Sequence, residues 1–276
     1  MKIFVTGASG FIGSNFIEIA NKKGIDIVGL KRKNSQSRID LSFEPNWVIG
    51  SLDDDFTKEF KEIDVLVHFA SHSPNVPYDS LEECIYWNVL STLKFFNTAL
   101  DAGVKNFLVA GSSFEYGTSA ANYNKIPANA PLTPIESYPI SKALASIALN
   151  GWAIKNNVKL TINRIFNVYG EGELSTRLWP SLKKAALKGE NFEMTFGEQI
   201  RDFINVNDLC KIFIQDLVYC NQKKGKPVIK NVGSGQAMSV IDFSRLWWEK
   251  WDAKGELLIG EIPYRENEIM RYIPEL

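Results

Sequence analysis

The chain has 276 residues and a formal net charge of −1, with 45% hydrophobic and 23% charged residues, which is typical of a globular protein of one or two domains and argues against nucleic-acid binding. Three cysteines without C-x-x-C spacing and only two histidines argue against a zinc site, so we expect Cys84, Cys210 and Cys220 to be small core residues in a reducing compartment. The N-terminal stretch lacks a cleavage region and no apolar run reaches roughly 18 residues, so we expect a cytoplasmic protein without a membrane span.

The first element is a strand that ends in a glycine-rich turn. Met1–Val5 is apolar, Thr6–Gly13 reads TGASGFIG, and a helical pattern of apolar residues follows. Gly7 permits a tight turn, Gly10 lets a ligand approach the backbone, and Gly13 lets helix and strand pack closely. The free N–H groups at the start of the helix suit a pyrophosphate. The alternative is a strand–helix turn that binds no ligand.

The second strand, Asp26–Leu30, ends at a basic turn. Lys31, Arg32 and Lys33 follow the strand, and no acidic residue appears until Asp40. In dinucleotide-binding folds an acidic residue here binds the adenosine 2′-OH, whereas a basic residue accommodates a 2′-phosphate. The turn therefore favours NADP over NAD, although a solvated basic turn is the alternative.

Strands and helices then alternate, which predicts an α/β fold with a Rossmann-type, doubly wound parallel sheet. A long loop over 117–137 is of the kind that is usually functional. The alternation is lost after residue 170, so we expect a nucleotide-binding domain of residues 1–170 that also receives 200–232. Residues 171–199 and 233–276 form a smaller, discontinuous α/β substrate domain in this interpretation. The expected strands are Trp47–Leu52, Asp64–Ala70, Asn106–Ala110, Lys159–Asn163, Phe192–Phe196 and Val228–Val232, and the expected helices are Leu81–Ala102, Tyr138–Asn156, Leu178–Leu187 and Leu209–Tyr219.

A phenol and an ammonium are expected on one face of the helix that follows the fifth strand. Tyr138 and Lys142 are four residues apart. A nearby ammonium lowers the pKa of a tyrosine, and such a phenol can act as a general acid–base. A hydroxyl from Gly111–Tyr116 could bind the reacting oxygen.

The chain resembles the extended short-chain dehydrogenases/reductases, in the group of nucleoside-diphosphate-sugar epimerases, dehydratases and ketoreductases. The resemblance covers nearly the whole chain and is specific for the family, but not for one substrate. Its motifs are TGASGFIG (Thr6–Gly13), VHFAS (Val67–Ser71), Asn88, GSSFEYG (Gly111–Gly117), YPISK (Tyr138–Lys142), RIFNVYGEG (Arg164–Gly172), RDFINVNDL (Arg201–Leu209), NVGSG (Asn231–Gly235) and PYRENEIM (Pro263–Met270).

The resemblance implies a role for each matching residue. Tyr138 would be the acid–base, Lys142 its partner and a ligand of the nicotinamide ribose, and Ser112, not its neighbour Ser113, the catalytic hydroxyl. His68 is expected to pack at the end of its strand. The implied cofactor residues are Gly7, Ser9, Gly10, Phe11, Ile12, Gly13, Lys31, Arg32, Leu52, Ala70 and Lys142; the implied substrate residues are Asn167, Arg201 and Arg265, and His72 could line that site.

Some of these assignments have simpler alternatives. Asn167 could instead anchor a loop by hydrogen bonds, and Arg201 and Arg265 could form surface ion pairs.

Departures from the family pattern narrow the reaction. Dehydratases carry Thr-Asp-Glu where this chain has Ser112, Ser113 and Phe114, and certain epimerase/reductases carry a Cys at the Phe114 position. With NADP favoured, the expected reaction is reduction of a 4-keto, 6-deoxy nucleotide sugar in polysaccharide or O-antigen biosynthesis. The alternatives are an NAD-dependent nucleotide-sugar 4-epimerase and, less favoured, a non-catalytic nucleotide-binding scaffold.

The resemblance also implies a homodimer. Family members usually pair through the Leu81–Ala102 and Tyr138 helices, and Trp87, Leu90 and Trp152 are compatible with such an interface. Family members also usually continue beyond PYRENEIM, so we expect the substrate domain to be truncated or completed by a partner.

Overall fold

The computed structural model describes residues 1–218, 222–266 and 268–276, so Cys220 and the expected helix end at Tyr219 lie outside the described residues. Its centre is a seven-stranded, wholly parallel sheet in the order β10-β6-β5-β4-β1-β2-β3. This confirms the predicted fold class. The strands are β1 (Lys2–Thr6), β2 (Asp26–Lys31), β3 (Asn46–Ile49), β4 (Val65–His68), β5 (Asn106–Ser112), β6 (Lys159–Ile165) and β10 (Val228–Val232).

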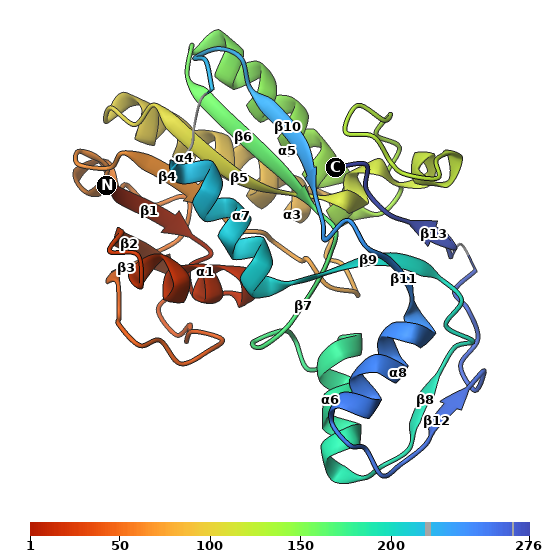
Figure 1. Ribbon diagram of the computed structural model, residues 1–276. Coiled ribbons are helices and arrows are strands. Elements are labelled where there is room, and N and C mark those ends of the chain that lie inside the picture. The colour runs from red at the N-terminus through yellow and green to blue at the C-terminus, as the bar shows by residue number, and fades with distance from the viewer. Residues whose placement is uncertain (219–221, 267) are drawn as a thin grey trace.

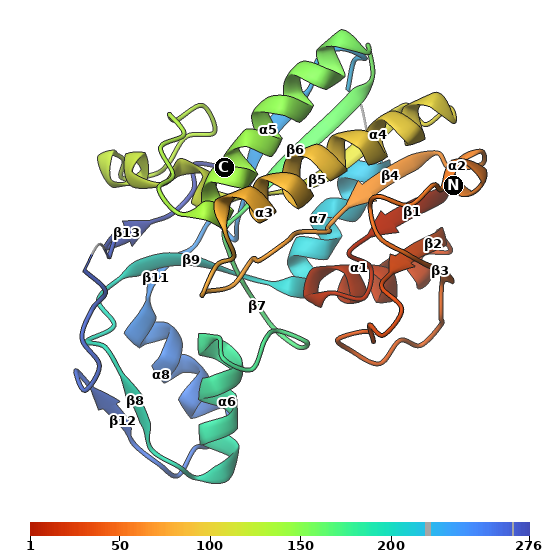
Figure 2. The same cartoon turned by 180° about the vertical axis from the view of Figure 1, so that it is seen from behind.

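Helices cover both faces of the sheet (Figures 1 and 2). On one face lie α1 (Phe11–Asn21) and α7 (Val206–Val218), and on the other lie α2 (Thr57–Phe60), α3 (Leu81–Ile85), η1 (Tyr86–Ser91), α4 (Thr92–Asp101) and α5 (Ser137–Lys155). Alternate residues of β1 feed the two cores: Ile3 and Val5 pack with α1 and α7, and Phe4 packs on the other side. Cys84 and Cys210 are buried, as expected. Among the described residues, no helix is long and apolar enough to span a membrane.

The single helix predicted over Leu81–Ala102 is interrupted by a π-helical turn, η1. Asn88 in this turn accepts a hydrogen bond from the backbone N–H of His72 at 2.7 Å and donates to Ser141 Oγ of α5 at 2.9 Å. Such turns often occur at functional sites, and this one fixes the loop after β4 against α5.

Only one of the three apolar residues expected at a dimer interface is freely exposed. Leu90 is 55% exposed. Trp87 instead lines the main cleft, and Trp152 packs against the core beside Phe96 and Phe107.

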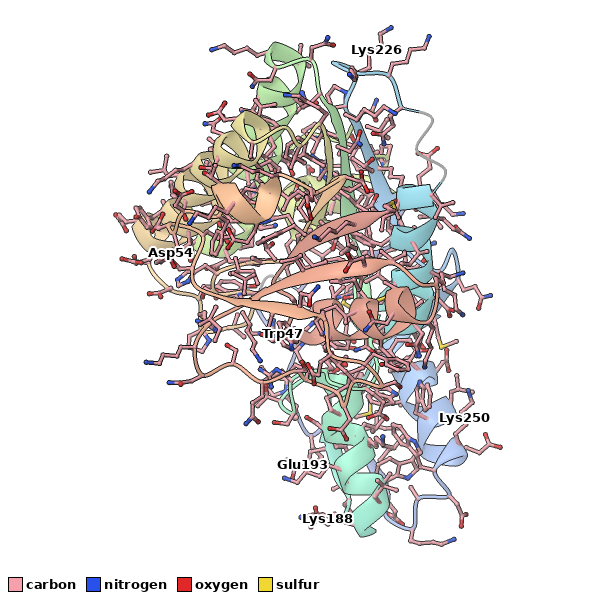
Figure 3. All side chains as sticks on the ribbon, turned by 90° about the vertical axis from the view of Figure 1, so that its left-hand side faces the viewer. Trp47, Asp54, Lys188, Glu193, Lys226 and Lys250 are labelled. Carbon is pink, nitrogen blue, oxygen red and sulfur yellow. The ribbon has the colours of Figure 1, made fainter. Side chains whose placement is uncertain are left out.

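The elements not yet named lie below the sheet and to its right in Figure 1. Here α6 (Leu178–Lys188) packs against α8 (Val240–Lys250), with Trp179, Trp247 and Trp251 in mutual ring contact. Charged side chains such as Lys188 and Lys250 lie at the periphery (Figure 3). The strands of this part are β7 (Asn167–Tyr169), β8 (Phe192–Met194), β9 (Ile200–Asn205), β11 (Ala237–Ser239), β12 (Leu257–Ile259) and β13 (Arg271–Tyr272).

The predicted loop over 117–137 is largely ordered by hydrogen bonds. The short 3-10 helix η2 (Ser113–Tyr116) precedes the loop, and a second one, η3 (Thr118–Asn122), occupies its start. Thr118 N donates to Thr133 O at 3.1 Å, and Ile126 N donates to the Ile273 carbonyl at 2.9 Å. The loop is therefore part of the packed structure beside the end of β5.

Candidate active site

The glycine turn brings three backbone segments into close contact. A Cβ on Gly13 would lie 2.2 Å from the Gly7 carbonyl oxygen, and a Cβ on Gly7 would lie 2.6 Å from the Ala70 nitrogen. Helix α1 begins after Gly10, which provides no side-chain cap. The first N–H groups of α1 are thus left to a ligand, and an anion such as a pyrophosphate fits there.

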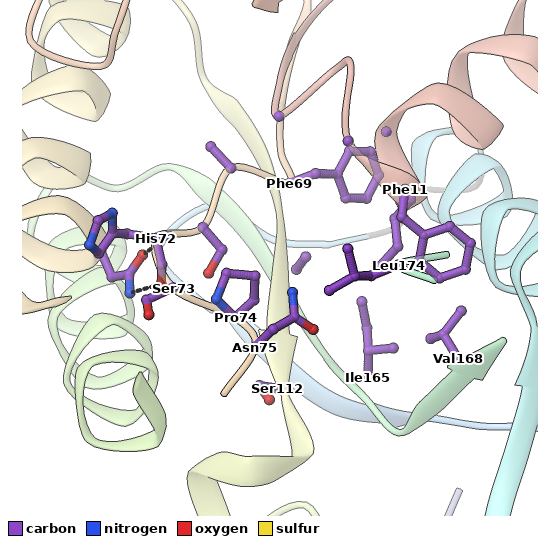
Figure 4. A pocket seen from close by; sticks show the side chains of 18 of the residues that line it. Phe11, Phe69, His72, Ser73, Pro74, Asn75, Ser112, Ile165, Val168 and Leu174 are labelled. Atoms are coloured by element: carbon purple, nitrogen blue, oxygen red, sulfur yellow. Dashed lines mark hydrogen bonds between the residues drawn. The ribbon is translucent and has the colours of Figure 1, made fainter. Parts of the chain in front are cut away.

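A cleft of about 850 Å³ opens at the carboxyl ends of β1, β2, β4, β5 and β6, the edge at which such sheets bind ligands. Every residue predicted to contact the cofactor or to be catalytic lines it. Figure 4 shows apolar side chains on one side of the cleft, among them Phe11, Phe69, Ile165 and Leu174, with His72 on the other. The predicted residues in its lining are Gly7, Ser9, Gly10, Phe11, Ile12, Gly13, Lys31, Arg32, Leu52, Ala70, Ser112, Tyr138 and Lys142.

The basic turn after β2 forms one end of this cleft. Lys31 and Arg32 line it, while Lys33 does not. The Lys31 ammonium lies 4.4 Å from the centroid of the Trp47 ring, a cation–π contact. Ser35 and Arg38 also line this end and were missed in the sequence, because the loop after the basic turn has no regular pattern that places its side chains. This set of side chains fits a 2′-phosphate.

Tyr138 is buried beside two hydroxyl groups. Burial raises the pKa of Tyr138 to about 12, and the hydroxyls of Ser71 and Ser112 offset the rise in part. The prediction that Lys142 lowers this pKa is wrong, because burial outweighs the other influences and the Lys142 ammonium instead donates to the Ala110 carbonyl at 2.8 Å. Tyr138 is consequently a neutral phenol at physiological pH and has a proton to donate.

The charges behind Tyr138 are buried as well. Burial lowers the pKa of Lys142, and the Glu115 carboxylate acts against that shift. Burial, followed by the charge of Lys142, lowers the pKa of His68 to about 3, and the neutral ring bonds to Thr6 Oγ1 at 2.8 Å. His68 therefore packs at the end of β4, as predicted.

Glu115 is a connector that the sequence did not reveal. One of its oxygens accepts from the backbone N–H of Ser112 at 2.8 Å. The other accepts from Ser146 of α5 and from Arg164 of β6, each at 2.7 Å. The carboxylate thereby ties the end of β5 to the helix that carries Tyr138.

A second cavity, of about 430 Å³, adjoins the first toward α6 and α8. Asn167, Arg201 and Arg265 line it, as predicted, and Arg177 is an additional cation there. Two of the predicted residues also have structural partners: Asn167 donates to the Asp202 carbonyl at 3.4 Å, and Arg201 is ion-paired with Glu268.

His72 lines the main cleft, but its imidazole is engaged elsewhere. Its Nε2 lies 3.0 Å from an Asp79 oxygen, and its ring lies along that of Trp87. Phe114 also lines the cleft, so an apolar side chain stands where the resemblance places the acid of dehydratases.

The chain is similar to known proteins over most of its length. The model of the NAD dependent epimerase/dehydratase family matches residues 3–233. The UDP-glucose 4-epimerase of Lactobacillus helveticus is 28% identical over 268 residues, covering 88% of this chain and 79% of that protein. The dTDP-4-dehydro-6-deoxy-D-allose reductase of Streptomyces bikiniensis is 27% identical over 263 residues, with the same shares of 88% and 79%.

Solved structures share the fold. A UDP-glucose 4-epimerase from Stenotrophomonas maltophila, with bound NAD and formylated UDP-arabinopyranose, superposes with a TM-score of 0.86 at 21% identity. The match covers 100% of this chain and 90% of that chain.

The glycine turn gives a direct test of the cofactor end. Gly13→Ala places a methyl group against the Gly7 carbonyl, so we expect dinucleotide binding to weaken more than tenfold and stability to fall by about 1–3 kcal/mol. A Cβ on Gly151, in α5, meets no atom of the same chain within 4 Å, so Gly151→Ala should leave NADPH binding unchanged. NADPH titration by fluorescence and urea unfolding measure both effects. Unchanged binding in Gly13→Ala would show that the turn does not hold the ligand.

Proposed function

The chain belongs to the NAD dependent epimerase/dehydratase family, and we propose that it is the family enzyme that reduces a 4-keto, 6-deoxy nucleotide sugar to the 4-hydroxy sugar with NADPH. One observation carries the proposal. The cleft joins a basic cofactor end to an arginine-lined cavity, and Ser112, Tyr138 and Lys142 lie between the two. The relatives include both epimerases and a reductase at similar identity, so the choice between them rests on these residues.

The described residues fit a nicotinamide dinucleotide, which supplies hydride when bound. The uncapped start of α1 would bind the diphosphate, and Arg32, Ser35 and Arg38 would bind a 2′-phosphate. Lys31 lines the same end and adds positive charge. In the described lining of the cleft, no Asp or Glu stands near these cations to bind a 2′-OH instead.

The protonation state of Tyr138 suits ketone reduction. When hydride adds to C4 of a ketone, the oxygen gains negative charge and needs a proton. A phenol whose pKa is raised to about 12 still carries its proton at neutral pH and transfers it to the alkoxide. Ser112, beside Tyr138, can donate a hydrogen bond to the same oxygen, and the Lys142 ammonium, which lines the same cleft, would bind the nicotinamide ribose.

The second cavity is proposed to bind the nucleotide part of the substrate. Arginine forms bidentate contacts with phosphate, and Arg177, Arg201 and Arg265 all line this cavity. Arg177 and Arg265 come from residues 171–199 and 233–276, which we propose on this basis to form the substrate-binding domain, and Arg201 is contributed by the adjoining segment 200–232.

The second candidate function is a nucleotide-sugar 4-epimerase that retains NAD. It uses the same three catalytic residues, and its support is the similarity to UDP-glucose 4-epimerases. The basic cofactor end argues against it. A non-catalytic scaffold is the least favoured, because it has no need of a tyrosine between two hydroxyls.

The first expected outcome concerns the preference of the protein for NADPH over NADH. The protein should bind NADPH at least tenfold more tightly than NADH, and the double variant Arg32→Ala/Arg38→Ala should lose that difference, because its 2′-phosphate contacts are removed. Lys33→Ala, in the same turn but outside the cleft lining, is the matched control. Equal or tighter binding of NADH by the wild type in a fluorescence titration would contradict the NADP assignment and favour the epimerase.

The second expected outcome concerns the reaction that the protein catalyses. With UDP- or dTDP-linked 4-keto-6-deoxyglucose, the protein should oxidise NADPH stoichiometrically, which is followed by loss of NADPH absorbance. Tyr138→Phe should slow this roughly 10²–10⁴-fold because the proton donor is gone, with NADPH affinity unchanged. Interconversion of UDP-glucose and UDP-galactose without net NADPH loss would refute the reductase, and inactivity of the wild type on every substrate with intact ligand binding would indicate the scaffold.

We also propose a homodimer formed through α3, η1 and α5, which lie side by side in Figure 2. Their outer face exposes Tyr86, Leu90, Leu144, Ile147 and Ile154, an apolar patch typical of an interface.

Ile147, which is 60% exposed on α5, provides the test of this interface. Light scattering should give a dimer for the wild type and a monomer for Ile147→Glu, because a charge would be buried in the contact. Leu187→Glu changes a residue that is 67% exposed on α6 and should leave the dimer intact. A monomeric wild-type protein would overturn the proposal.

A further inference from the structure

The carboxylate of Glu173 has an unusual position, because it lies where the two cavities adjoin. Glu173 lies between β7 and α6 and lines both of them, and no other Asp or Glu within residues 1–218, 222–266 and 268–276 lines either. Its side chain is only 8% exposed. Glu173 is thus an acidic side chain among lysines and arginines that suit anionic ligands.

Glu173 has an unused acceptor. Its Oε2 is buried and has no hydrogen-bond partner among the described residues. The nearest cation is Arg177, whose Nε lies 3.6 Å from Oε1, which is too far for a good hydrogen bond. The Arg177 side chain is itself 43% exposed, so the pair is loose.

Such an arrangement is unfavourable for the protein alone. Burial raises the pKa of Glu173 to about 7, against the opposing effects of Arg177 and of the Gly170 backbone. A buried carboxylate oxygen without a partner destabilises a fold, and buried polar groups in native proteins are nearly always bonded. A hydroxyl or amino group of a ligand at this position would supply the missing partner.

The position of Glu173 identifies which part of the ligand that is. Four other residues also line both cavities, so they mark the junction between them. The reacting carbon must lie beside Tyr138 in the first cavity, and the diphosphate belongs with the arginines of the second. The hexose ring between these groups then occupies the junction. The four residues are Asn75, Asn167, Val168 and Arg177.

We infer that Glu173 is a specificity-determining residue of the sugar subsite: its free Oε2 accepts a hydrogen bond from a hydroxyl or amino group of the hexose, and its charge disfavours sugars that carry a carboxylate. The inference rests on the proposed binding of a nucleotide sugar. It narrows the substrate class to hexoses that present a hydrogen-bond donor to the junction, and it disfavours uronic acids.

The test compares two nucleotide sugars that differ by one carboxylate. The wild type should bind UDP-glucose at least tenfold more tightly than UDP-glucuronic acid by calorimetry at about pH 8, above the raised pKa of Glu173, where this carboxyl is mainly charged. Glu173→Gln keeps the shape of the side chain and removes its charge, so it should reduce this ratio about tenfold. Glu171→Gln, two residues earlier and 67% exposed, is the matched control and should keep the wild-type ratio. UDP-glucosamine tests the C2 position: a gain over UDP-glucose that Glu173→Gln removes places the C2 amine at Glu173, and no gain shows that the donor is another group of the sugar.

The possible failures are distinguishable. If both sugars bind and Glu173→Gln leaves their ratio unchanged, or if Glu171→Gln changes it equally, the role of Glu173 is refuted while nucleotide-sugar binding stands. If no UDP- or dTDP-linked sugar binds the wild type, both proposals fail. Thermal melting checks folding, and Glu173→Gln should be at least as stable as the wild type because a buried charge is removed.

Discussion

The carboxylate of Glu115 connects the elements on which the candidate chemistry depends. It bonds the backbone at Ser112, the Ser146 hydroxyl of α5 and the Arg164 guanidinium of β6, all within 2.8 Å. Arg164 continues the network to the Ala128 carbonyl of the 117–137 loop. A buried pair of this kind has little net effect on stability compared with apolar residues, but removing one partner is costly. What it contributes is geometry, because Ser112 and Tyr138 come from different elements and have to meet.

The two ends of the site differ from its centre in their charge. The cofactor end and the substrate end both present cations, which suits two ligands that each carry a diphosphate. Between them the side chains are buried, so Tyr138 keeps its proton and the Lys142 ammonium donates to the Ala110 carbonyl. Glu173 is the exception in this pattern. The same burial that makes the centre of the cleft suitable for proton transfer also makes each unpaired polar group there informative.

Much of this architecture could be predicted from local patterns in the sequence. The turn at Gly7 and Gly13, the Tyr138–Lys142 spacing and the alternation of strands and helices are short-range signals, and the structure brings the residues that they marked into one cleft. The strands β7, β9, β11, β12 and β13 were not predicted. All but β9 are only two or three residues long, and all five are defined by pairing between distant segments.

Some functional features could not be predicted, because they depend on where an irregular loop places a side chain or on how deeply that side chain is buried. Arg38 and Glu173 reach the cleft from irregular loops, so no periodicity could mark them. The pKa of Tyr138 was predicted to fall and instead rises, because the sequence reveals the neighbouring ammonium but not the extent of burial. The raised pKa is compatible with ketone reduction, which needs a protonated phenol.

The most direct test of that assignment follows the hydride. NADPH carrying deuterium at the transferred position is incubated with the protein and a nucleotide-linked 4-keto-6-deoxy sugar, and the product sugar is analysed by mass spectrometry. The account predicts one deuterium at C4 for each NADP formed. A product without deuterium, or a sugar that is epimerised while the cofactor is returned unchanged, would contradict it.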